Sequence, residues 1–284
     1  MRSFWTVMKL ELYLFWRSWT TWLIALAIIL IGVLAADNNR NQPWGIWGQI
    51  VTVGMFLALI LTFSTGNQIN RDRERRLDGV IFSTPVMTTI YVLAKYSAAL
   101  LSLLALTGLS LLAAMLTDQF YNVPRQVLFL SPVVYPSLGV QVYLLGWVWV
   151  MLVPVIFGAA FIFATITLTR GNRVAAYIVT LLTWLIPVFT ASLNPAVFFD
   201  ISATSFLYSS SPAVDFWIQH YPGGSPAPIP LPQFIQKIMP LARTEVPPAA
   251  LLDNLLWNRL FFLGLAAVLL YITMLGVQRS RRNA

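Results

Sequence analysis

Six long apolar stretches are the feature that most constrains the fold of this chain. They lie near residues 18–36, 46–66, 92–116, 141–168, 174–193 and 256–277. At a helical rise of about 1.5 Å per residue, each can cross roughly 30 Å of hydrocarbon. A helix satisfies its own backbone hydrogen bonds, as a lipid environment demands. The pattern therefore predicts an all-α membrane protein with six transmembrane helices, which together form one domain over residues 18–277.

The composition agrees with a membrane protein. Apolar residues make up 58% of the chain and charged residues 10%, whereas soluble domains carry about 25% charged residues. The chain has no cysteine, which excludes disulfides and cysteine-based metal sites. The net charge of +8 is explained by the excess of lysine and arginine in the cytoplasmic loops of membrane proteins and by their attraction to anionic lipid headgroups. We therefore expect membrane lipids as partners, and no nucleic acid.

The first apolar stretch has a second interpretation, because Leu34, Ala35 and Ala36 resemble a signal-peptide cleavage site. The run is longer than the usual apolar region of about 7–15 residues in a signal peptide, and the segment before it is long and aromatic. We therefore expect a transmembrane helix here.

Lysine and arginine divide unequally between the two sides of the predicted bundle. Thirteen fall on one side and five on the other, and the richer side is expected to face the cytoplasm. This places both termini, the loop at 67–91 and the tail at 278–284 in the cytoplasm, and the proline-rich insertion at 194–255 outside. We expect a multi-pass protein of the inner (plasma) membrane. The cytoplasmic set is Arg2, Lys9, Arg17, Arg71, Arg73, Arg75, Arg76, Lys95, Arg170, Arg173, Arg279, Arg281 and Arg282; the external set is Arg40, Arg125, Lys237, Arg243 and Arg259.

Residues 1–17 form an amphipathic segment before the first span. At helical spacing, one polar stripe runs along Arg2, Thr6, Lys9, Tyr13 and Arg17. This pattern predicts an interfacial helix on the inner leaflet. Glu11 falls on the face opposite the stripe, where an acid needs either a partner or a route to water.

Several kinds of chemistry have no motif in the sequence. There is no Gly-rich turn followed by Lys and Ser or Thr for nucleotide phosphates, and no Gly-x-Ser-x-Gly elbow. The single histidine, His220, lies in the external insertion. The central parts of the six stretches carry no ionisable residue of the kind that ion-coupled transporters use. We therefore predict no catalytic residue and no metal site, and we expect that the chain is not an enzyme.

The loop at 67–91 carries the densest charge. Mixed charges are followed by a short apolar edge, which is compatible with a docking surface for another protein or with a loop that only sets topology. We also expect Glu11 to pair with Arg75 or Arg76, which would tie residues 1–17 to this loop. The charged positions are Arg71, Asp72, Arg73, Glu74, Arg75, Arg76 and Asp78, and the apolar edge is Val80, Ile81 and Phe82.

Residues 71–101, RDRERRLDGVIFSTPVMTTIYVLAKYSAALL, resemble the region that follows the second helix of ABC-2 type permeases. The likeness rests on the mixed-charge segment, on Ser83-Thr84-Pro85, and on Tyr91 and Lys95 leading into the third span. The amphipathic start, the six spans and the large insertion between spans five and six also match. The motif itself covers about 30 residues, and the layout covers the chain.

The resemblance implies a type V ABC exporter-like fold and a specific role. The chain would be the membrane subunit of an ATP-binding-cassette transporter, paired with a second, identical or related, permease chain. ATP and Mg would bind to a separate ATPase subunit, and this chain would hold no cofactor. Residues 1–17 would be the connecting helix, and residues 70–84 would hold the coupling helix, so that Arg71–Phe82 and Glu11 would contact or support the ATPase.

Other functions remain open from the sequence. The alternatives are a membrane scaffold or assembly subunit, an ion-coupled carrier, and a membrane-embedded enzyme. The apolar spans with Trp147, Trp149 and Trp184 fit a lipid-like substrate, but they equally fit contact with lipid and neighbouring helices.

Overall fold

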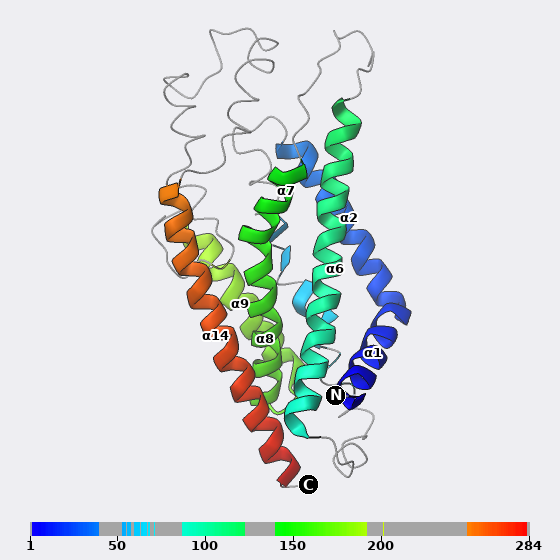
Figure 1. The fold of residues 1–284 in the computed structure, drawn as a ribbon, viewed down its shortest axis with the longest axis vertical. Coiled ribbons are helices and arrows are strands. Elements are labelled where there is room, and N and C mark those ends of the chain that lie inside the picture. Colours follow the sequence, from blue (N-terminus) through cyan, green and yellow to red (C-terminus); the bar gives the residue numbers. More distant parts are fainter. Residues whose placement is uncertain are drawn as a thin grey trace.

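The structure is a computed structural model, and its described part is a bundle of helices (Figure 1). It describes residues 2–39, 87–122, 140–191 and 249–282, together with positions 53, 54, 56, 57, 60–62, 64–66, 68, 71 and 201. Within these residues the chain is all-helical, and no strand occurs. The predicted all-α class is therefore confirmed for the described part.

Within the described residues, eight helical elements have defined bounds. They are α1 (Arg2–Arg17), α2 (Trp19–Asn39), α6 (Thr88–Asn122), α7 (Val140–Trp147), the π-helical turn η1 (Val148–Leu152), α8 (Val153–Leu168), α9 (Arg173–Ala191) and α14 (Ala249–Arg282). The two ends of the chain lie toward the same end of the bundle, the lower end in Figure 1.

Three continuous segments are long and apolar enough to cross a membrane: Thr88–Thr117, Val148–Leu168 and Leu255–Arg279. The bent pair Ser3–Arg17 and Trp19–Leu34 adds a fourth if it is one broken span. α9 is apolar over Arg173–Pro187 but shorter, and most of the predicted stretch at 46–66 lies outside the described residues. The described part thus holds three to four candidate spans, which is compatible with a multi-pass membrane protein.

The chain turns sharply between α1 and α2, by 71°. The last carbonyls of a helix have no partner within it, and here side chains of α2 supply donors. Thr21 Oγ1 donates to the carbonyl of Phe15 at 2.6 Å, and Trp22 Nε1 donates to the carbonyl of Trp16 at 3.0 Å. These bonds hold the bend at Ser18, one residue from the boundary that the sequence predicts between its amphipathic segment and its first span.

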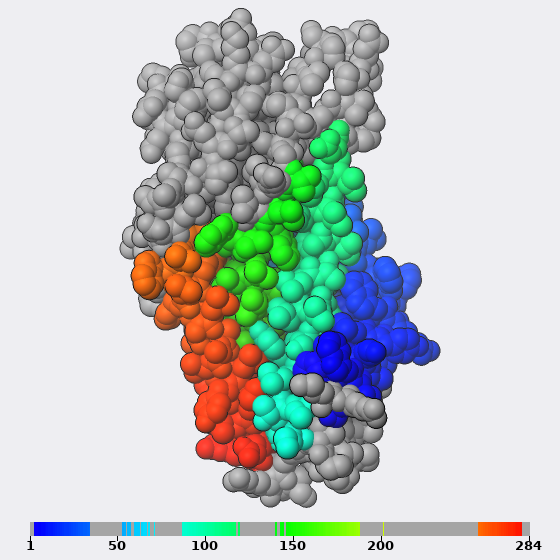
Figure 2. Space-filling model, viewed as in Figure 1, coloured from blue at the N-terminus to red at the C-terminus, as the bar shows by residue number. Residues whose placement is uncertain are grey.

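α8 lies at the centre of the bundle. The 18-residue apolar window within Val148–Leu168 is 78% buried inside the protein. The corresponding window of Leu255–Arg279 is only 17% buried. α14 packs along α8, whereas α1 and α2 pack against α6. Figure 2 shows α14 and α6 adjoining on one face, with α1 and α2 beyond α6. The exposed apolar side chains of α14 and α2 are what lipid contact requires.

Hydroxyl side chains inside the apolar helices bond to their own backbone. Six of them donate to the carbonyl four residues earlier, which removes the cost of an unsatisfied hydroxyl in an apolar setting. These bonds explain how polar residues fit within the spans without forming an ion site. The set includes Ser102, Thr107, Thr165, Thr167, Thr180 and Thr273.

Candidate functional site

The site begins with a close contact between α1 and α6. Ala94 and Ala98, one turn apart on α6, are fully buried and form an apolar cluster with Met8 of α1. Small residues at this spacing let two helices approach closely. Glu11 lies three residues after Met8 and therefore faces α6 as well.

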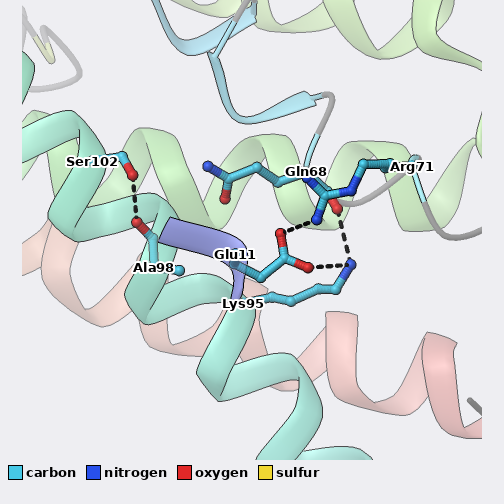
Figure 3. Close-up of polar contacts among 6 residues, drawn as sticks. All are labelled: Glu11, Gln68, Arg71, Lys95, Ala98 and Ser102. Atoms are coloured by element: carbon cyan, nitrogen blue, oxygen red, sulfur yellow. Dashed lines mark hydrogen bonds and ion pairs between the residues drawn. The ribbon is translucent and has the colours of Figure 1, made fainter. Parts of the chain in front are cut away.

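The carboxylate of Glu11 lies between two cations (Figure 3). Its Oε2 is 2.6 Å from Nη2 of Arg71, and its Oε1 is 3.2 Å from Nζ of Lys95. Glu11 and Lys95 are buried, and Arg71 is only slightly exposed. A buried carboxylate requires such compensation. The acid on the face opposite the basic stripe therefore has partners and does not need to reach water.

Lys95 joins three parts of the chain. Beyond Glu11, its Nζ donates to the backbone carbonyl of Gln68 at 2.9 Å and lies 5.1 Å from the centre of the Tyr91 ring. An ammonium has three donors and no acceptor, so a carboxylate and a carbonyl suit it, and the ring face adds a cation–π contact. Lys95 thus ties α6 to α1 and to the backbone at Gln68. We call Glu11, Arg71, Lys95 and the carbonyl of Gln68 the inner ion cluster.

The side chain of Gln68 points away from the inner ion cluster (Figure 3). Gln68 is 3% exposed, and neither atom of its amide has a hydrogen-bond partner within the described part of the chain. The cluster therefore uses the backbone of Gln68 and not its side chain.

The predicted site residues are described only in part. Glu11 and Arg71 come together, and among the described residues the ion-pair partners of Glu11 are Arg71 and Lys95. The expected pairing of Glu11 with Arg75 or Arg76 involves residues outside the described part of the chain. Arg71 reaches Glu11 because Gln68, three residues earlier, is already held against α6 by Lys95. The remaining predicted positions lie outside the described residues: Asp72, Arg73, Glu74, Arg75, Arg76, Asp78, Val80, Ile81 and Phe82.

Two cations that the sequence places at the membrane interfaces are buried. Lys95 and Arg259 are each 2% exposed and lie within the apolar segments Thr88–Thr117 and Leu255–Arg279. The sequence-based expectation concerned only the central parts of the six stretches. These two cations lie near the start of the stretches at 92–116 and 256–277, and the structure buries them there. The sequence does contain a signal for the burial of Lys95, because the small residues Ala94 and Ala98 beside it are spaced as in a close contact between two helices.

The inner ion cluster is suited to holding elements together. Both carboxylate oxygens of Glu11 are engaged by cations, so the group is not positioned as a free base. Among the described residues, no group of three or more His, Asp or Glu side chains is arranged to hold a metal ion. Comparison of the sequence with known protein families and with curated proteins finds no match.

Proposed function

We propose that this chain is the membrane-spanning permease subunit of an ABC transporter of the ABC-2 type, and that it acts as an exporter. The apolar helices supply a membrane domain, and the sequence has no nucleotide-binding motif of its own. A chain of this kind needs an energy source that arrives from a partner. The resemblance of residues 71–101 to ABC-2 permeases names that partner as an ATPase subunit.

The observation that carries the proposal is the burial of Glu11 between Arg71 and Lys95. Arg71 is the first residue of the charged segment 71–84, which we assign as the ATPase-coupling surface. Through the inner ion cluster, the start of this segment is bonded to α1 and to α6. A displacement of the segment by an ATPase would therefore act on two helices at once.

The proposed architecture has six spans. Five of the spans are α2, α6, the α7–η1–α8 segment, α9 and α14. The sixth span is formed by residues 46–66. α1 is the interfacial connecting helix, which agrees with its 71° turn from α2. The excess of lysine and arginine orients both termini toward the cytoplasm in the inner (plasma) membrane.

The proposed assembly has two permease chains and an ATPase. Six helices of one chain pair with those of a second, identical or related, chain, and the transport path lies between them. ATP and Mg bind to the ATPase subunits. Native mass spectrometry of the complex from mild detergent should show two copies of the permease, or one copy with a related chain. A stable complex that contains a single permease and no related chain would contradict the proposed pairing.

An ion-coupled carrier is the second candidate, because Glu11 is an acid buried inside the protein. Its two short contacts to cations weigh against it, since a coupling carboxylate must release its partners to take up an ion. In proteoliposomes, uptake or release driven by a proton or sodium gradient without ATP would favour the carrier.

The experiment targets the coupling surface. The Phe82→Asp variant and the Arg75→Glu/Arg76→Glu double variant should insert normally but recover less ATPase subunit on co-purification from native membranes. ATP hydrolysis of the complex in lipid should fall in parallel. The matched control is Arg279→Glu/Arg282→Glu, which makes the same charge change at the end of α14. Full ATPase recovery and full hydrolysis with both loop variants would contradict the proposal, and absence of any ATPase from the wild-type preparation would favour a scaffold.

A further inference from the structure

The fourth apolar segment changes its helical form just before a proline. The π-helical turn η1 (Val148–Leu152) connects α7 to α8, and Pro154 is the second residue of α8. An α-helical bond to the carbonyl of Val150 would come from the amide of residue 154, four positions later. A π-helical bond to the carbonyl of Trp149 would come from the same amide, five positions later. Proline has no N–H, so neither bond can form.

A guanidinium from another helix occupies the place of the missing donor. Arg259, on α14, is 2% exposed. Its Nε donates to the carbonyl of Trp149 at 2.8 Å, and its Nη2 lies 3.4 Å from the carbonyl of Val150. Arg259 thus reaches the two carbonyls on this segment that the amide of residue 154 would serve, that of Val150 in an α-helical register or that of Trp149 in a π-helical one.

The same guanidinium also reaches a third element. Its Nη1 donates to the carbonyl of Ile201 at 2.9 Å and to Oδ1 of Asn258 at 3.1 Å. Ile201 is buried and belongs to the long segment between α9 and α14. Arginine suits this position because its planar fork directs several donors at fixed angles, which an ammonium on a flexible stem does not.

We propose that Arg259 is a positioning residue that replaces the missing amide of Pro154, and that η1 is a hinge between α7 and α8 whose setting Arg259 couples to the backbone at Ile201. A π turn inserts one residue into the helical path, so its loss rotates α7 about α8 by about 100°, one residue of a 3.6-residue turn. Movement at Ile201 is therefore linked through one side chain to the direction of α7. This inference does not depend on the proposed transport function.

The first test is a double-mutant cycle on the purified full-length chain in detergent. With Pro154 present, Arg259→Met should lower the thermal unfolding midpoint by roughly 5–10 °C, because the backbone carbonyls of Trp149 and Val150 lose the donors that Arg259 supplies within the protein. In a Pro154→Ala background, the new amide can bond to these carbonyls, so the same change at Arg259 should cost less than half as much. Arg259→Lys keeps the positive charge but loses the planar, multi-donor guanidinium. Its unfolding midpoint should lie between those of the wild type and Arg259→Met.

The control is Arg279→Met, an exposed arginine on the same helix, which should have the same small effect in both backgrounds. An equal loss from Arg259→Met with proline and with alanine at position 154 would overturn the proposal. If Arg259→Met cannot be purified, the Pro154→Ala/Arg259→Met chain should be recoverable, and failure of both would also overturn it.

The second test measures the hinge itself. The chain has no native cysteine, so spin labels at Leu144→Cys on α7 and Leu168→Cys on α8 report only on the segment across η1. Both positions are exposed, and they are about 36 Å apart if the helix is continuous. We expect one narrow distance distribution in the parent and a broad one after Arg259→Met. A distribution of unchanged width after Arg259→Met would show that Arg259 does not hold the hinge.

Discussion

Glu11 and Lys95 are bonded across the contact between α1 and α6, with Oε1 and Nζ 3.2 Å apart and both side chains almost fully buried. The two residues are 84 positions apart in the sequence. Their pairing fixes α1, which carries the amphipathic pattern of an interfacial helix, against the first part of α6. Arg71 completes the compensation of the carboxylate from a third segment.

Removal of the Glu11 carboxylate should destabilise the protein more than loss of an exposed ion pair. Glu11→Gln leaves Lys95 buried with a charge that is no longer compensated, which costs about 3–5 kcal/mol in comparable cases, against about 0–1 kcal/mol for an exposed pair. The thermal unfolding of the purified chain in detergent measures this. Lys95→Met added to Glu11→Gln should recover part of the loss, because it removes the orphaned charge. A double variant that is as unstable as the sum of the two single variants would contradict the pairing.

Gly32 should tolerate no side chain, because α2 and α6 approach each other there. A Cβ at this position would lie 2.7 Å from the backbone oxygen of Ser110, which cannot move out of the way as a flexible side chain can. Gly32→Ala should therefore force the two helices apart and lower the unfolding midpoint. Gly108→Ala on α6 is the matched control, since nothing lies within 4 Å of its added Cβ and alanine favours a helix by about 1 kcal/mol. Equal effects of the two substitutions would contradict this close approach.

Arg170 should be replaceable by glycine without loss of stability. It has a φ of 54° at the end of α8, in the left-handed region where glycine is favoured. The amide of Gly171 donates to the carbonyl of Ile166 at 2.9 Å, and that of Arg170 donates to the carbonyl of Thr167 at 3.2 Å. These two bonds are typical of a helix end that is closed by a left-handed residue, and the next residue, Gly171, also has a positive φ of 88°. Arg170→Gly should stabilise the chain by up to about 1 kcal/mol, whereas Arg170→Val should destabilise it. A stability loss with glycine would show that the arginine side chain contributes more than its backbone strain costs.

The sequence predicts features that depend on local pattern. The length of the apolar runs locates α2, α6, α8 and α14, because a helix in lipid needs a minimum number of apolar residues. The bend near Ser18 follows from the change of amphipathic pattern after Arg17. The acid at position 11 is recognisable as needing a partner, since it stands alone on an apolar face.

Features that depend on contacts between distant segments were not predictable in the same way. Lys95 and Arg259 stand near the ends of apolar stretches, where a cation ordinarily reaches the interface. Their burial depends on acceptors elsewhere: Glu11 and the Gln68 carbonyl for Lys95, the carbonyls of Trp149, Val150 and Ile201 for Arg259. Pro154 removes a backbone donor from the fourth stretch, but the sequence alone does not show which side chain compensates for it.

The last prediction concerns the orientation of the chain in the membrane. The excess of lysine and arginine on one side predicts that residues 194–255 lie outside and residues 67–91 inside. Because the chain has no native cysteine, a single cysteine at Ser225 should react with a membrane-impermeant maleimide in intact cells. A cysteine at Ser83 should react only after permeabilisation, and a cysteine at Leu104, within α6, should react in neither case. The reverse pattern for Ser225 and Ser83 would place the inner ion cluster on the external side, where an ATPase supplied with cytoplasmic ATP could not reach the segment that begins at Arg71.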